Sequence, residues 1–345
     1  MISIICVGDI NLKFEGKLEF EKEIINIFKK GDIRFGNLET VVSEKKGIIK
    51  EKAFNFKVSP KKLELLSPLK FDILNIANNH TLDFGEDLKK DTKNYVLQQG
   101  IKVIGENKRL YDVEILNIKD KKIAFIGIES YREKIPNDLI DLVKELRKKV
   151  EYIVVSIHWG IELCLSPSKK QRKFAHKLID SGVNIIVGHH PHVLQGVEKY
   201  NKGVIIYSLG NFQFEIEKED IELTQYTNIL ELLIDGEDIQ VKEHPIFILK
   251  NGNPTLKLEK ETEEKYMQIK KRCNYCIKNL TFFNFLKEVS LYNMEQHLIA
   301  WKIRKEKKEK NYLLKKIKWF LHPKIIILYI LFLINKKLLI GEKNI

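Results

Sequence analysis

The sequence predicts an α/β fold: a sandwich with mixed β-sheets, continued by a helical extension toward the C-terminal end. Short apolar runs alternate with amphipathic helical patterns from residue 2 to residue 182, which is typical of strand–helix units. Two apolar runs at 224–234 and 239–249 flank a polar turn and predict an antiparallel hairpin, so the sheets are mixed. After residue 251 the pattern becomes rich in Lys and Glu with a helical period.

Each predicted element follows from a local pattern. Strands are expected where short apolar runs end in Gly, Asn, Asp or His, and helices where apolar residues recur about every 3.6 residues. The expected strands are 2–8, 32–38, 71–77, 102–104, 112–118, 122–128, 152–157, 183–188 and 204–212. The expected helices are 18–30, 61–66, 86–99, 137–149 and 169–181.

The charge distribution divides the chain of 345 residues. We expect a main domain over 1–250, a basic helical extension over 251–318 and an apolar C-terminal segment over 319–345. Residues 301–345 hold 13 Lys or Arg and 3 Asp or Glu, so most of the net charge of +13 lies there. The apolar run 325–334 would form about 15 Å of helix, half of a bilayer core. This pattern favours a membrane-interface anchor, with a core helix or a partner-binding helix as alternatives.

The four cysteines predict no disulfide framework. Cys273 and Cys276 form a single CxxC motif in a Lys-rich helical stretch, where a chance pair is favoured over a redox or zinc site. The sequence opens with a predicted strand and shows no basic leader or cleavage site, so a cytoplasmic protein is expected.

Polar side chains with metal-binding chemistry follow the predicted strands. They are Asp9, Asn37, Glu39, Asn79, His80, His158, His190 and His192. Each one alone has an ordinary explanation, such as a turn, a helix cap or a satisfied core histidine. Because parallel strands bring their carboxyl ends to one edge of a sheet, we expect these side chains to converge.

The chemistry of this set predicts a metal centre. Carboxylate, carboxamide and imidazole groups without thiolate suit Mn, Fe or Zn. The groups are more than one ion needs, so two ions about 3.5–4 Å apart and bridged by one carboxylate are expected. Such a centre makes hydroxide available at neutral pH and suits hydrolysis. His80 is the candidate acid for the leaving group, and Asp83 would orient its ring.

Taken together, these motifs resemble the capsule-synthesis protein CapA family. They are Gly8-Asp9, Asn37-Leu-Glu39-Thr40, Asn78-Asn79-His80 with Asp83, His158-Trp159-Gly160, Gly188 to His192, and Tyr207 to Phe212. Members of that family are associated with poly-γ-glutamate capsules, and the family is similar to the calcineurin-like metallophosphoesterases. The resemblance implies a four-layer sandwich of two mixed sheets with flanking helices. It also implies Asp9, Glu39, Asn79, His158, His190 and His192 as metal ligands, with His80 as the acid.

Some positions depart from the pattern of the wider superfamily. Asn11 stands where an Asp-x-His motif has its histidine, and the region of Glu39 replaces a Gly-Asp-x-x-Asp motif. His190 and His192 match the Gly-His-x-His motif better than a pair with His189 does.

Two functions are compatible with these observations. The first is a metal-dependent hydrolase of capsule polymer metabolism, acting on a polyanionic polymer or a phosphate-containing substrate. The alternative is a non-catalytic scaffold subunit of a membrane-bound capsule polymer synthase. Either protein would lie in the cytoplasm, peripheral at the inner face of the membrane, with synthase subunits as partners. No nucleic-acid partner is expected, because the basic residues lie in the tail and no nucleic-acid-binding motif occurs.

Overall fold

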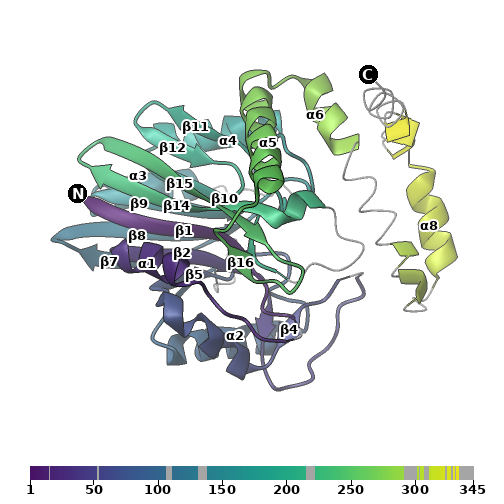
Figure 1. Cartoon of the computed structure of the whole chain (residues 1–345), viewed down its shortest axis with the longest axis horizontal. Helices are drawn as coiled ribbons and strands as arrows, with labels where there is room; N and C mark the ends of the chain where they lie inside the picture. Colours follow the sequence, from purple (N-terminus) through teal and green to yellow (C-terminus); the bar gives the residue numbers. More distant parts are fainter. Residues whose placement is uncertain are drawn as a thin grey trace.

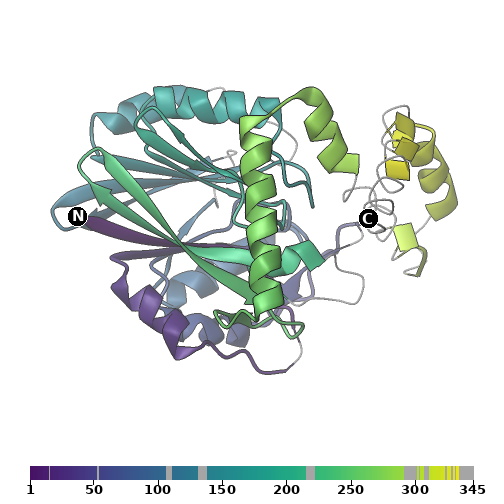
Figure 2. The same cartoon turned by 45° about the horizontal axis from the view of Figure 1, so that its top comes forward.

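Two β-sheets pack face to face, and helices cover the outer face of each sheet (Figures 1 and 2). The structure is a computed structural model. It describes residues 1–14, 16–52, 54–105, 111–130, 138–214, 222–290, 301–302, 304–306, 311–322, 325–327, 329–330 and 332–333. The predicted fold class, a four-layer α/β sandwich with two mixed sheets, is confirmed.

The larger sheet has eight strands. Its order is β16 (Pro254–Thr255), β15 (Asp238–Ile248), β14 (Tyr226–Asp235), β1 (Ile2–Ile10), β2 (Ile33–Leu38), β5 (Ile73–Asn75) and β6 (Lys102–Ile104), and β13 (Asn211–Gln213) also pairs with β1. Strands β1, β2, β5 and β6 run parallel, whereas β14 is antiparallel to β1 and to β15. The parallel set brings the carboxyl ends of β1, β2 and β5 to one edge.

The smaller sheet has six strands. Its order is β11 (Val197–Tyr200), β12 (Gly203–Ile206), β10 (Ile185–His189), β9 (Tyr152–His158), β8 (Lys121–Glu129) and β7 (Tyr111–Ile118). The four central strands are parallel, and the edge strands β7 and β11 are antiparallel to their neighbours. In the register of β9 and β10, His158 lies opposite His189.

Three hydrophobic layers hold the sandwich together. Between the sheets, Phe35, Phe125 and Val187 belong to one fully buried cluster. The outer face of the larger sheet is covered by α1 (Lys22–Lys30), the 3-10 helix η1 (Pro60–Leu69) and α2 (Glu86–Gln98), and that of the smaller sheet by α3 (Leu139–Arg147) and α4 (Lys169–Asp180). The helix predicted over 18–30 begins only at Lys22, although Ile24 and Phe28 have the expected spacing of one buried face.

The strand predicted over 204–212 is wrong as a single element, because the chain crosses between the sheets within it. β12 ends at Ile206 in the smaller sheet, and β13 begins at Asn211 in the larger one. At the crossing Gly210 has φ of +68°, which favours glycine. A Cβ on Gly8 would come within 2.0 Å of the carbonyl oxygen of Gly210. The backbone N–H of Asp9 donates to that oxygen at 3.0 Å, so the crossing fixes the end of β1.

Glu198 on β11 ties α4 to the edge of the smaller sheet. Its carboxylate accepts hydrogen bonds from Arg172 Nε at 3.1 Å and Tyr207 Oη at 2.7 Å, and it lies 3.1 Å from His176 Nε2. Burial alone would raise the pKa of Glu198, but the hydrogen bonds and the guanidinium charge lower it below its ordinary value. His176 is thus part of a structural network on α4.

Helices follow the last strand, as the periodicity of the extension predicts. The described ones are α5 (Lys260–Lys278), α6 (Phe282–Glu288) and α8 (Tyr312–Phe320). Cys273 and Cys276 are buried on α5, where Cys273 packs with Leu194. The domain limits at residues 250 and 318 stay a prediction, and much of the apolar segment 319–345 lies outside the described residues. None of the described helices combines the length and apolar character needed to cross a membrane.

Candidate metal centre

Candidate ligands from both sheets converge at one edge of the sandwich. Asp9 lies near the end of β1, Glu39 directly follows β2, and His158 ends β9. His190 and His192 lie just beyond β10, both with positive φ, at 96° and 58°. Such backbone angles are rare for residues with a side chain and are typical of functional turns.

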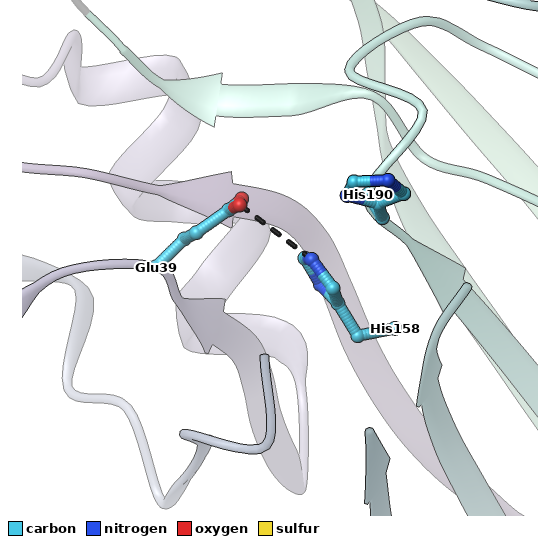
Figure 3. A group of neighbouring side chains, drawn as sticks. All are labelled: Glu39, His158 and His190. Atoms are coloured by element: carbon cyan, nitrogen blue, oxygen red, sulfur yellow. Dashed lines mark ion pairs between the residues drawn. The ribbon is translucent and has the colours of Figure 1, made fainter. Parts of the chain in front are cut away.

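Three overlapping groups of side chains could hold a metal ion. They are Glu39 with His158 and His190, Asp9 with Glu39 and His192, and Glu162 with His190 and His192, each with ligand atoms within 4.8 Å of one another. Figure 3 shows the first group, in which Glu39 and His158 point toward each other and His190 lies beside them. Glu39 belongs to two of the groups, as a bridging carboxylate would.

Glu39 is a fully buried carboxylate with an unusual environment. Its Oε1 lies 3.5 Å from His158 Nε2 and 3.8 Å from His192 Nε2. Within the described part of the chain, neither carboxylate oxygen accepts a hydrogen bond. Burial, followed by the negative charge of Asp9, raises the pKa of Glu39 well above its ordinary value. An ionised carboxylate that accepts no hydrogen bond in a buried site is costly unless a cation binds it. Without a cation, Glu39 avoids this cost by keeping a proton and sharing a hydrogen bond with Asp9. Two adjacent buried carboxyl groups beside imidazoles fit a divalent metal ion.

Asp9 is held in its ionised form by its neighbours. Asn37 Nδ2 donates to its Oδ1 at 2.8 Å, and the backbone N–H of His190 donates to its Oδ2 at 3.3 Å. Rings of His189 and His192 approach its oxygens to 3.2 Å and 3.4 Å. Burial alone would raise the pKa of Asp9, but His189, His192 and Asn37 together lower it.

His158 and His190 are neutral at pH 7. Burial, reinforced by the neighbouring imidazoles, lowers the pKa of His158 well below its ordinary value. Burial and His192 lower the pKa of His190 to about 3. Neutral imidazole is the form that binds metal ions.

Asn79 lies at the margin of the centre and is half-buried. Its Oδ1 is 2.9 Å from His158 Nε2, the same ring nitrogen that faces Glu39. The carboxamide of Asn79 therefore reaches the same space as the two other side chains.

His80 lies next to the ligand groups, and two charged residues contact its ring. Its Nδ1 is 2.7 Å from Asp83 Oδ2 and 3.1 Å from Lys52 Nζ, and its Nε2 is 3.8 Å from Glu39 Oε1. Burial lowers the pKa of His80 to about 4, so the ring is neutral at pH 7 and carries one proton. When Lys52 donates to Nδ1, that proton sits on Nε2 and faces the ligand groups. When Asp83 accepts a hydrogen bond from Nδ1, the proton of the ring sits on Nδ1 instead.

A loop covers His80. We call it the covering loop: residues 43–52 and 54–56, between β3 (Val41–Val42) and β4 (Lys57–Val58). Asp83 fastens it, because its carboxylate pairs with Lys52 and accepts the backbone N–H of Phe56 at 2.8 Å. The ring of Phe56 stacks on His80 at 4.2 Å between centroids. The covering loop therefore shields the candidate acid from water.

Sequence reasoning missed three contributors to the centre. His189 joins the expected Asn37 in positioning Asp9, Lys52 contacts His80, and Glu162 completes the third ligand group. Glu162 carried a signal, since it lies four residues after His158, which ends a strand and is a predicted ligand. Lys52 carried none, because it lies in an irregular loop.

Comparison with known proteins identifies the family. A family model described as bacterial capsule synthesis protein PGA_cap matches residues 18–215. The chain belongs to this family. The matched region contains Glu39, His80, His158, His190 and His192, so most of the candidate centre lies within it. The family assignment confirms the resemblance noted from the motifs.

Curated relatives support the same family. This chain is 33% identical over 222 residues to the PGA biosynthesis protein CapA of Bacillus subtilis, and the match covers 58% of each chain. It is 31% identical over 265 residues to the capsule biosynthesis protein CapA of Bacillus anthracis, covering 65% of this chain and 63% of that one. The chain thus spans about three fifths of the length of these relatives.

Solved structures are more distant. A hypothetical protein from Thermus thermophilus has a TM-score of 0.47 and 14% identity, covering 71% of this chain and 98% of that chain. The 5'-nucleotidase of Candida albicans has a TM-score of 0.42 and 11% identity, covering 81% and 58%. At this distance neither says anything about activity.

Proposed function

We propose that this PGA_cap family protein is a metal-dependent hydrolase of capsule polymer metabolism with a dinuclear centre. Its substrate would be an anionic polymer of the poly-γ-glutamate type, or a phosphate-containing precursor of one. The bond cleaved would be an amide, a phosphate ester or an anhydride.

The observation that carries the proposal is the environment of Glu39. A fully buried carboxylate that accepts no hydrogen bond among the described residues costs several kcal/mol in its ionised form unless cations offset it. The overlap of two ligand groups at Glu39 favours two ions over one. One ion would be held by Asp9, Glu39 and His192, and the other by Glu39, His158 and His190, with Asn79 beside His158. Mn, Fe or Zn bound there supplies an acidified water and charge stabilisation for the reacting group.

The protein's own residues would then control proton transfer. His80 can donate a proton to a leaving group only from Nε2, the nitrogen that faces Glu39. Lys52 favours that tautomer by donating to Nδ1, and Asp83 holds Lys52 in place through an ion pair. The stacked ring of Phe56 excludes water from His80. The expected reaction is hydrolysis with His80 as the acid and Asp83 as its positioning residue.

The first test is the metal content of purified protein by elemental mass spectrometry, for wild type, His190→Ala and His176→Ala. We expect about two equivalents of Mn, Fe or Zn in the wild type and in His176→Ala, which removes a histidine outside the centre, and fewer in His190→Ala. Hydrolysis of γ-glutamyl amides, phosphate esters and anhydrides with Mn(II) should then require His80. No bound metal after incubation with Mn(II), or full activity in His80→Ala, would overturn the proposal.

One observation favours a second function, a non-catalytic scaffold of a capsule polymer synthase. Asn11, where a ligand histidine would be expected by resemblance, donates from Nδ2 to the backbone oxygen of Glu39 at 3.1 Å and so serves structure. Polymer production in cells separates the two functions. A scaffold would keep production in His80→Ala and His158→Ala, whereas an enzyme would lose it with the protein still folded.

A further inference from the structure

Helix α8 presents an apolar face to solvent. Leu313, Leu314 and Leu321 are 65%, 61% and 68% exposed, and Ile317 is 46% exposed. At about 100° per residue, these four positions fall within roughly 100° of the helix circumference. A stripe of this width is what an amphipathic helix uses to bury one face.

Lysines flank this apolar face, and no acidic residue interrupts it. Lys316 and Lys318 lie roughly 100° to either side of the centre of the stripe. The sequence from Tyr312 to His322 contains three lysines and neither Asp nor Glu. The combination of exposed aliphatic side chains with flanking cations is complementary to an anionic lipid surface, in which lysines reach the headgroups.

The opposite side of α8 faces the protein. Lys315 Nζ pairs with Glu51 Oε1 at 2.8 Å, and the ring of Trp319 lies 5.9 Å from that of Trp301. Glu51 belongs to the covering loop, next to Lys52. In both views α8 lies at the end of the molecule toward which β1 runs from the N-terminus (Figures 1 and 2). The helix is therefore seated with its apolar face outward.

The segment after α8 continues the exposed apolar surface. Ile326, Ile327, Ile330 and Leu333 are exposed as well. Helix α8 has nine residues, which is about 14 Å, or half the thickness of a bilayer core. A helix of this length with flanking lysines fits a bilayer surface and does not reach across it.

We propose that α8 docks this protein on the surface of an anionic lipid bilayer, with Leu314 and Ile317 in the headgroup region and Lys316 and Lys318 on the lipid phosphates. This inference is independent of the metal centre and holds whether or not the protein is an enzyme. A second copy of the chain on the same apolar face would not account for the flanking lysines, since like charges would meet across the interface.

The test is flotation of the full-length chain with vesicles. Vesicles of phosphatidylcholine with about 30% phosphatidylglycerol, an anionic lipid, are compared with phosphatidylcholine alone. We expect flotation with the anionic vesicles and little with the neutral ones. Leu314→Glu with Ile317→Glu should lower the partition coefficient at least about 30-fold. Lys316→Gln with Lys318→Gln should lower it about 30-fold on anionic vesicles only.

The matched control also replaces one exposed Leu and one exposed Ile by Glu, at positions far from α8. Leu97 on α2 and Ile115 on β7 are 42% and 41% exposed, so Leu97→Glu with Ile115→Glu should float like the wild type. Circular dichroism verifies that every variant is folded. The proposal fails if the wild type does not float, or if the α8 variant floats as well as the control. It also fails if light scattering shows a dimer that the α8 variant dissociates while neither protein floats.

Discussion

The replacement of Glu39 by Gln should change stability differently with and without metal. The amide keeps the shape of the side chain and removes its charge. In the metal-free protein, burial and the nearby Asp9 raise the pKa of Glu39 well above its ordinary value, so its charge costs free energy in the folded state. We therefore expect Glu39→Gln to leave the free energy of unfolding unchanged, or to raise it, when metal is removed by a chelator.

With metal present, the wild type should be more stable than Glu39→Gln. At a metal concentration a hundredfold above Kd, each occupied site adds about 2.7 kcal/mol to the free energy of unfolding. Glu39 belongs to two of the three ligand groups, so its loss weakens two sites. The wild-type gain of about 5 kcal/mol should fall below about 2 kcal/mol in the variant. That difference corresponds to a change in Tm of very roughly 6–10 °C.

The assay is thermal unfolding followed by circular dichroism, in EDTA and in MnCl2. Glu231→Gln is the matched control, because Glu231 is a buried carboxylate on β14 that pairs with Lys242 and His244 and belongs to none of the ligand groups found among the described residues. It should keep the full metal-induced rise in Tm. The same rise in Glu39→Gln as in the wild type would refute the assignment of Glu39 as a ligand.

Three further predictions concern the covering loop, the crossing between the sheets and the network of Glu198. Asp83→Asn breaks the anchor of the covering loop and should lower the free energy of unfolding by about 2–4 kcal/mol in urea titrations, whereas Asp87→Asn, at an exposed pair on α2, should not change it. Gly8→Ala should lower the free energy of unfolding by about 1–3 kcal/mol in urea titrations, because its Cβ meets a carbonyl oxygen. The control Gly16→Ala has open space at its Cβ and should lower it by about 1 kcal/mol, from its positive φ alone. A larger loss in Gly16→Ala than in Gly8→Ala would show that the crossing between the sheets can move. The hydrogen bonds to Glu198 lower its pKa below the ordinary 4.5, so their contribution to stability is present above that pH and is lost as the pH falls below it. Glu198→Gln should therefore lose less stability than the wild type between about pH 5 and pH 3, and equal losses in urea titrations would contradict this.

The sequence predicted the elements and strand-end residues that depend on local pattern. Asp9, Glu39 and His158 each follow or end an apolar strand, and the parallel order of those strands brings them to one edge. Such positions can be found because the strand period and the residue that ends it are adjacent in the chain. Their role as metal ligands stays a prediction.

Other features depend on tertiary contacts that leave no local trace. Lys52 reaches Asp83 only because β3 and β4 pair over two residues each, too short a stretch to show alternation. The motif match uses His190 and His192 and leaves His189 without a predicted role. In the structure His189 ends β10 and faces Asp9 across the gap between the sheets. The run 204–212 is apolar throughout most of its length, so nothing in its period indicated that the chain changes sheets.

The distribution of the ligands over both sheets has a consequence for the order of folding. Asp9 and Glu39 come from the larger sheet, and His158, His190 and His192 come from the smaller one. In the proposed dinuclear centre each ion would draw ligands from both sheets, whereas the group of Glu162, His190 and His192 follows strands of the smaller sheet alone. Binding of both ions would therefore follow the docking of the two sheets, and the metal would stabilise the finished sandwich.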